Sequence, residues 1–136
     1  PDAKFSMAFV KVGLHPDWGG SVMLSGLVNR SIAFELMATG DTLDAERAHA
    51  LGLVNQVVDA EVLENVVKVT AQRLAHGPSD VFARLKASSL RNEGLSPESL
   101  RAHLDEESRQ MEATVTSPDA REGLRAFLEK RAPKFG

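Results

Sequence analysis

One carboxylate stands out early in the sequence because of the residues around it. Asp17 lies between Pro16 and the pair Gly19–Gly20, where an apolar segment gives way to a helix-like one. Proline fixes its own φ and glycines remove side-chain bulk, so another group can approach this backbone closely. Loops at the ends of buried elements often carry functional residues. Asp17 is therefore a candidate acid or base, with Trp18 as an adjacent aromatic wall.

Two plainer interpretations stay open from the spacing alone. Aspartate is a common N-cap, so Asp17 could serve only to cap the helix that follows. Trp18 could be an ordinary packed aromatic residue. Elsewhere the sequence has no cysteine and no glycine-rich phosphate motif, and its four histidines show no metal-ligand spacing. We therefore assign no metal site.

The elements around Asp17 follow from local patterns. Residues 4–12 carry apolar side chains with weak alternation and predict a buried strand that ends at Gly13. Residues 21–28 predict a short helix. Asn29 is placed to cap a second helix, which Gly40 stops.

The middle of the chain predicts a change from strand to helix. Asp44 can cap a helix over 45–51, and the apolar residues of 53–58 read as a strand. Residues 60–75 have the three- and four-residue spacing of a core-facing helix, and His76 to Pro78 break it. The predicted core-facing stripe comprises Val62, Leu63, Val66, Val67, Thr70 and Leu74.

Three more helices complete the chain. One begins at Ser79 and ends around Asn92, Glu93 and Gly94. Ser96-Pro97 and Ser117-Pro118 are two helix starts, each with a capping hydroxyl before a proline. The first of these helices has a narrow apolar seam: Leu100, Leu104, Met111 and Val115. The second is predicted to extend to Arg131 and to bury Ala120, Leu124, Phe127 and Leu128. Its last turn would hold the cations of Lys130 and Arg131, which complement the helix dipole.

Composition limits the function classes. The chain has 136 residues, 43% of them hydrophobic, and a formal charge of −3. This is typical of a globular protein, and no basic stripe indicates nucleic-acid binding. Apolar runs are short and the first residues lack a signal-peptide core, so we expect a cytoplasmic protein that does not enter a membrane.

Four segments together resemble a known family. Residues 8–21 (AFVKVGLHPDWGGS), 33–40 (AFELMATG), 48–58 (AHALGLVNQVV) and 117–135 (SPDAREGLRAFLEKRAPKF) are similar, in this order, to the second half of enoyl-CoA hydratase/isomerase (crotonase) superfamily members. The resemblance implies an α/β fold: residues 1–59 as the C-terminal part of an acyl-CoA-binding β-β-α spiral, and residues 60–136 as a mostly helical trimerisation region.

The resemblance also implies a substrate and partners. The family binds acyl-CoA, so coenzyme A belongs to the substrate and no separate cofactor is expected. Two backbone N–H groups of the family's first half hold the thioester oxygen. We expect that half to be missing from this chain or supplied by a separate polypeptide, and the assembly to be a homotrimer or hexamer.

Residue by residue, the resemblance favours isomerisation. Asp17 matches a position where several isomerases and aromatic acyl-CoA dehalogenases have aspartate, whereas Phe9 stands where hydratases have their second glutamate. A carboxylate walled by Phe9, Trp18 and ligand would be desolvated, which suits general acid–base work. Phe127 and Lys130 match positions that reach the nucleotide end of CoA in a neighbouring subunit.

Alternatives remain open at this point. Asp17 could act as a nucleophile or activate water, as in hydration or another reaction of the family. The chain could also be a non-catalytic module whose long helices serve only oligomerisation. For Lys130 and Arg131, favourable electrostatics at a helix end is the plainer interpretation.

Overall fold

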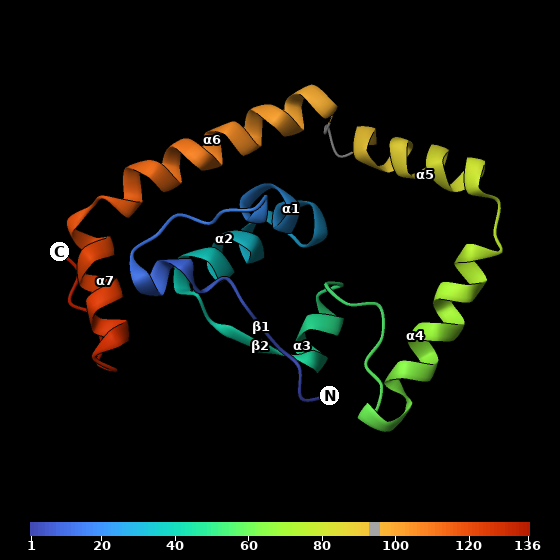
Figure 1. Ribbon diagram of the computed structural model, residues 1–136, viewed down its shortest axis with the longest axis horizontal. Helices are drawn as coiled ribbons and strands as arrows, with labels where there is room; N and C mark the ends of the chain where they lie inside the picture. The colour runs from blue at the N-terminus through green and yellow to red at the C-terminus, as the bar shows by residue number, and fades with distance from the viewer. Residues whose placement is uncertain (93–95) are drawn as a thin grey trace.

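In the part of the chain that the structure describes, helices predominate and two short strands accompany them (Figure 1). The computed structural model describes residues 1–92 and 96–136, with side chains described for residues 1–89 and 96–136. In chain order the elements are β1 (Lys4–Ser6), the 3-10 helix η1 (Ala8–Val12), α1 (Gly20–Leu27), α2 (Arg30–Thr39), β2 (Thr42–Asp44), α3 (Ala45–Ala50), α4 (Ala60–Ala75), α5 (Ser79–Asn92), α6 (Pro97–Val115) and α7 (Pro118–Leu128).

The two strands form one antiparallel ribbon. Phe5 pairs with Leu43 at its centre. The prediction of a single strand over 4–12 is wrong beyond Ser6, because the chain then tightens into η1. Gly13 ends η1 at φ +71, and its N–H bonds back to the helix. Pairing in β2 was not foreseen, since a three-residue strand carries too short a pattern to recognise.

The predicted strand over 53–58 is also wrong. These residues follow α3 as irregular backbone. Their apolar side chains reflect partial burial rather than strand pairing. Hydrophobic periodicity cannot distinguish partial burial from strand pairing in so short a run. Leu53, for example, packs against the core cluster without joining a ladder.

A small core lies between α1 and α2. Leu24, Ala33 and Leu36 are buried there. The half-buried hydrophobic residues around them come from several elements, including β2 and the loop after α3: Met7, Val28, Ile32, Met37, Leu43 and Leu53. This cluster anchors α1, and therefore the loop that precedes α1.

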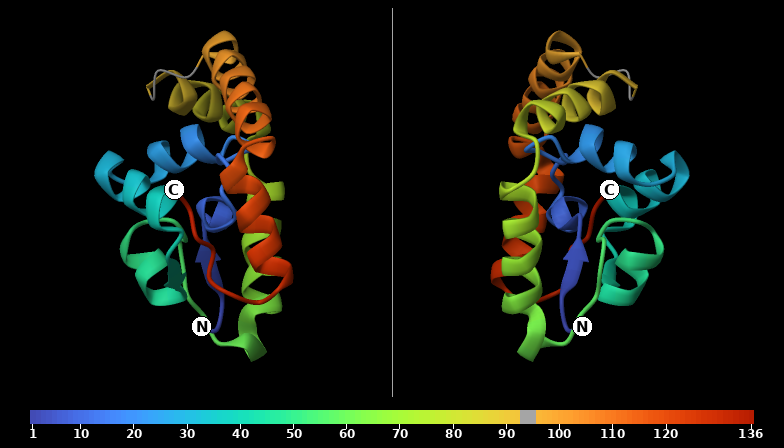
Figure 2. Two further views of the ribbon diagram at one scale, coloured as in Figure 1. Left: turned by 90° about the vertical axis from the view of Figure 1, so that its left-hand side faces the viewer. Right: turned by 90° about the vertical axis from the view of Figure 1, so that its right-hand side faces the viewer.

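The C-terminal helices fold back over the start of the chain. Figure 2 shows the first residues passing between α7 on one side and α2 and α3 on the other. The contact between η1 and α7 is very close: a Cβ at Gly13 would lie 2.6 Å from the carbonyl carbon of Asp119, and one at Gly123 would overlap the backbone of Val12. Glycine is therefore required on both sides of this contact.

Helix α7 departs from its predicted limits. It ends at Leu128, because Lys130 adopts φ +54 and Arg131 bonds its N–H to the Ala126 carbonyl. Lys130 and Arg131 therefore lie beyond the last turn. The buried residues are Ala120, Gly123 and Ala126, so only the first of the predicted set is confirmed; Leu124, Phe127 and Leu128 are exposed.

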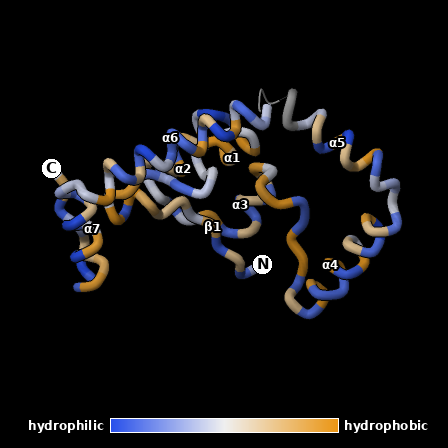
Figure 3. Tube along the Cα trace, turned by 45° about the horizontal axis from the view of Figure 1, so that its top comes forward, coloured by the Kyte–Doolittle hydropathy of each residue, from blue (hydrophilic) through white to orange (hydrophobic). Residues whose placement is uncertain are grey.

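Helices α4 and α5 extend away from the body formed by β1 to α3 (Figure 1). The helix over 60–75 is confirmed, but the burial expected for its stripe is wrong within this chain. Val62, Leu63, Val67, Thr70 and Leu74 are exposed, and Val66 is only half-buried. In Figure 3 the chain leading into α4 is strongly hydrophobic, as are parts of α4 itself.

The predicted helix caps are confirmed. The side chains of Asn29, Asp44, Ser96 and Ser117 each accept a backbone N–H from the helix that follows. Gly40 ends α2 in the left-handed region. The end of α5 at Asn92 agrees with the prediction, whereas Glu93 and Gly94 lie outside the described residues.

Candidate active site

The Asp17 loop forms a tight turn directly before α1. The Asp17 carbonyl accepts the Gly20 N–H at 3.0 Å, while Trp18 and Gly19 have φ values of +58 and +79. Two successive positive φ angles are the pattern of a type I′ turn. Left-handed backbone is unfavourable for tryptophan, and such residues persist only where the surroundings hold them.

Asp17 itself is half-buried. Its Oδ1 accepts the Trp18 N–H at 2.7 Å. Its Oδ2 receives no hydrogen bond from the residues that the structure describes, so one carboxylate oxygen is held and the other is available. The Asp17 carboxylate does not cap α1. The N–H group that it accepts belongs to Trp18, whereas the helix begins at Gly20. The plain interpretation of Asp17 as a helix cap is therefore wrong.

Phe9 and Trp18 meet beside this turn. Their ring centroids are 6.4 Å apart with planes at 76°, an edge-to-face contact of the kind aromatic pairs prefer. Phe9 is half-buried in η1, whereas Trp18 is 90% exposed. The structure thus brings three of the predicted site residues, Phe9, Asp17 and Trp18, to one place.

Sequence reasoning missed Glu107, a further residue at this loop. It lies in α6 with only 2% of its surface exposed. Its carboxylate accepts the Gly19 N–H at 2.7 Å and the Ser21 N–H at 2.8 Å, and so caps α1 from a distant helix. A signal was present: Glu107 stands three residues after Leu104 and four before Met111, within the apolar seam.

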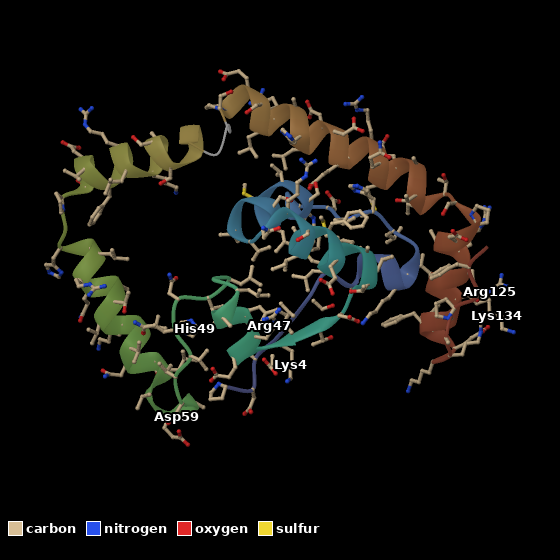
Figure 4. The ribbon with its side chains drawn as sticks, turned by 180° about the vertical axis from the view of Figure 1, so that it is seen from behind. Lys4, Arg47, His49, Asp59, Arg125 and Lys134 are labelled. Atoms are coloured by element: carbon tan, nitrogen blue, oxygen red, sulfur yellow. The ribbon has the colours of Figure 1, made fainter. Side chains whose placement is uncertain are left out.

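The other two predicted site residues, Phe127 and Lys130, lie at the far end of α7. Phe127 is 71% exposed and Lys130 is exposed as well. Figure 4 labels Arg125 on α7 and Lys134, whose backbone N–H returns to the Glu122 carboxylate of the same helix.

Arg131 has a structural partner rather than a free charge. Its guanidinium makes two bonds to the Glu122 carboxylate, at 2.6 and 3.0 Å. This pairing, helped by the Lys134 N–H, lowers the pKa of Glu122 to about 2. The ion pair ties the segment after α7 back onto the helix.

A separate hollow of about 690 Å³ follows the apolar side of α4. Leu63, Val66, Val67 and Leu74 contribute to its wall. It is lined by none of the predicted site residues. Within the described residues, no three histidine, aspartate or glutamate side chains gather as a metal site would require.

Comparison with known proteins identifies the family of the chain. The family model of enoyl-CoA hydratase/isomerase matches residues 1–136. The chain belongs to this family. The isomerase and hydratase branches are both represented among its relatives: it is 39% identical over 133 residues to 1,2-epoxyphenylacetyl-CoA isomerase of Escherichia coli and 36% identical over 135 residues to crotonyl-CoA hydratase of Syntrophomonas wolfei.

Each of these matches covers 98% of the chain and 50% of the relative, so the chain spans about half the length of the curated relatives it matches. A crystal structure of an enoyl-CoA hydratase from Mycobacterium avium subsp. paratuberculosis agrees with a TM-score of 0.90 at 34% identity, covering 98% of this chain and 53% of that one. The fold is therefore a mostly helical part of the family fold, with two short strands where the sequence predicted more β structure. Among the described helices, none is both long and apolar enough to span a membrane.

Proposed function

We propose that the protein moves a carbon–carbon double bond within an unsaturated acyl-CoA, with Asp17 as the general acid and base. The observation that carries this proposal is the half-buried Asp17 carboxylate, which has one oxygen held by the Trp18 N–H and the other available beside the Phe9–Trp18 pair. A fixed carboxylate with one available oxygen suits proton transfer at a carbon close by.

The chemistry needs only one such group. The Asp17 carboxylate takes a proton from the carbon next to the thioester of a 3-enoyl-CoA, and the electron pair delocalises onto the thioester oxygen. The same carboxyl then returns the proton at the far end of the delocalised system, which gives the conjugated 2-enoyl-CoA. No atom is gained or lost. Backbone donors from the family's other half would stabilise the oxyanion, and such donors typically contribute a few kcal/mol each.

Phe9 favours this reaction over hydration. By resemblance, hydratases carry their second glutamate at this position, and a phenyl ring can neither activate water nor donate a proton. The ring instead lies against Trp18 and can limit water near the carboxylate. A relative named trans-2-decenoyl-[acyl-carrier-protein] isomerase, from Streptococcus mutans, is 33% identical over 132 residues.

Phe127 and Lys130 fit a role at the nucleotide end of CoA bound in a neighbouring subunit of a trimer or hexamer. Both side chains are exposed; Phe127 supplies an aromatic ring near the end of α7, and Lys130 supplies a cation three residues later, beyond the helix. A phosphate and an adenine ring would be complementary to this pair.

Asp17→Asn tests the proposal. Asparagine keeps an oxygen for the Trp18 N–H and removes only the charge and the proton-transfer capacity. In the purified protein at its natural length, we expect turnover of a 3-enoyl-CoA, followed by ultraviolet absorbance of the conjugated product, to be lost while CoA-ester affinity stays near that of the parent. Asp59→Asn, an exposed control before α4, should be silent. Unchanged turnover in Asp17→Asn refutes the assignment.

Hydration is the second candidate, because relatives such as the Syntrophomonas wolfei enzyme carry that name. In that case Asp17 would activate water or act as a nucleophile. Incubation with a 2-enoyl-CoA separates the two reactions, since hydration destroys the conjugated absorbance that isomerisation creates. Absence of both reactions, together with assembly into oligomers that bind no CoA ester, would favour a purely structural module.

A further inference from the structure

Glu107 is a buried acid that the proposed chemistry does not use. Its carboxylate accepts three hydrogen bonds, all from one short segment: the Gly19 N–H at 2.7 Å, the Ser21 N–H at 2.8 Å and the Ser21 hydroxyl at 2.5 Å. Gly19 is 88 residues away in the sequence. Burying a carboxyl group without partners is costly, and these three hydrogen bonds offset that cost for Glu107.

The segment it holds is the turn that carries Asp17. Asp17 begins this turn by accepting the Gly20 N–H, and Gly19 lies inside the turn with its own N–H directed to Glu107. The turn contains Trp18 in the left-handed region, which does not persist without external support. Glu107 supplies that support through the Gly19 and Ser21 N–H groups.

Helix α6 holds the other flank of Asp17 as well. The Thr114 hydroxyl oxygen accepts the His15 N–H at 3.1 Å. Thr114 and Glu107 are seven residues apart, which places them on the same face of α6 about 10 Å apart along the axis. The residues on either side of Asp17 are therefore tied to one rigid helix.

The residue type matters in this position. The N-cap of α1 is Gly19, which has no side chain to accept the first N–H groups of the helix. A carboxylate presents an oxygen to each of two N–H donors and is favoured at the positive end of a helix. Glutamine would keep one acceptor oxygen but turn an amino group towards the second donor.

We propose that Glu107 is a positioning residue, which sets the Asp17–Ser21 turn and thereby the direction of the Asp17 carboxylate toward substrate. This inference rests on the proposed function of Asp17. It predicts that loss of Glu107 affects the rate of proton transfer more than the binding of the CoA ester, because the Glu107 carboxylate is buried and bonds to the turn.

The variants are Glu107→Gln, Glu107→Asp and the control Glu112→Gln, which alters an exposed acid on the same helix. For Glu107→Gln we expect kcat to fall by about 10- to 100-fold, as for a small misplacement of a catalytic group, with KM close to that of the parent. Glu107→Asp should restore part of the lost rate, and Glu112→Gln should leave both constants unchanged. Ser21→Ala, which removes one donor and keeps both amide bonds, is a milder variant with an expected loss of about 2- to 10-fold.

Trp18 gives a readout that does not depend on activity. It is the sole tryptophan of the sequence, and the difference from a Trp18→Phe background isolates its fluorescence. Without substrate, Glu107→Gln should lower the fluorescence anisotropy of Trp18, because the turn is released. If Asp17→Asn stays active, the proposed function fails, but this anisotropy still decides whether Glu107 holds the turn. Parent-like kcat in Glu107→Gln, or unchanged anisotropy, overturns the inference; if Glu107→Gln does not fold, Ser21→Ala decides by the same two measurements.

Discussion

Gly123 of α7 rests directly on the backbone of Val12 in η1, with no space for a Cβ between them. We expect Gly123→Ala to lower the free energy of unfolding by about 1–3 kcal/mol, because the methyl group overpacks a backbone contact that cannot yield easily. Gly26→Ala, at an exposed position in α1, should be neutral or slightly stabilising, since alanine favours helix. Denaturant unfolding of the two variants measures the difference; equal stabilities would show that η1 and α7 do not meet as described.

Helix capping gives a second prediction, in which variants at two N-cap aspartates are compared. The Asp44 side chain accepts the Arg47 N–H at 2.7 Å, whereas Asp59 stands at the N-cap of α4 without a side-chain bond. Asp44→Ala should cost about 1 kcal/mol of stability and Asp59→Ala distinctly less. Thermal unfolding monitored by circular dichroism tests the order, and a larger loss for Asp59→Ala would contradict it.

Lowering the pH should weaken the ion pair between Glu122 and Arg131. Folding lowers the pKa of Glu122 to about 2, so its pairing stabilises the fold above the ordinary glutamate pKa. That stabilisation is lost as pH falls from about 4.3 toward the folded value. The stability difference between the parent and Glu122→Gln should therefore be constant near neutrality and shrink over this window.

Urea titrations at several pH values check this prediction. Because the pair lies at the surface, added salt should reduce the difference as well. A difference that is independent of pH between 7 and about 2 would show that the ion pair does not form in solution.

Lys130 combines an unfavourable backbone with a proposed binding role. Its φ of +54 occupies the position after α7 where glycine is preferred. Lys130→Gly should raise stability by up to about 1 kcal/mol. The same change should weaken CoA-ester binding at low salt if Lys130 faces the nucleotide. Calorimetry and thermal unfolding measure both effects, and unaltered affinity would remove Lys130 from the site.

Helix positions were predictable from sequence because their signals are local. Asn29, Asp44 and the two Ser-Pro pairs each act within three residues of where they stand, and the structure confirms all of them. The strands were not predictable in the same way. Whether residues 53–58 pair depends on a partner strand, and an apolar pattern gives no information about the partner.

The candidate site likewise contains residues that local sequence patterns predict and one residue that they do not. Asp17, Phe9 and Trp18 belong to two neighbouring segments, and the unusual Pro-Asp-Trp-Gly-Gly composition marked the loop. Glu107 depends on contact across the fold, so its role follows only from the packing of α6 on the loop. The apolar stripe of α4 shows the same limit for burial. Its amphipathic pattern correctly predicts a helix, but the pattern does not say whether another element covers these side chains, most of which are exposed.

The 88-residue separation between Glu107 and Gly19 also affects the order of events during synthesis. A ribosome releases the Asp17 loop long before α6, so a nascent chain cannot complete the turn until α6 has emerged. The geometry of the Asp17 turn would thus be acquired only after α6 has emerged, and a chain interrupted before Glu107 would lack it however well its earlier helices had formed.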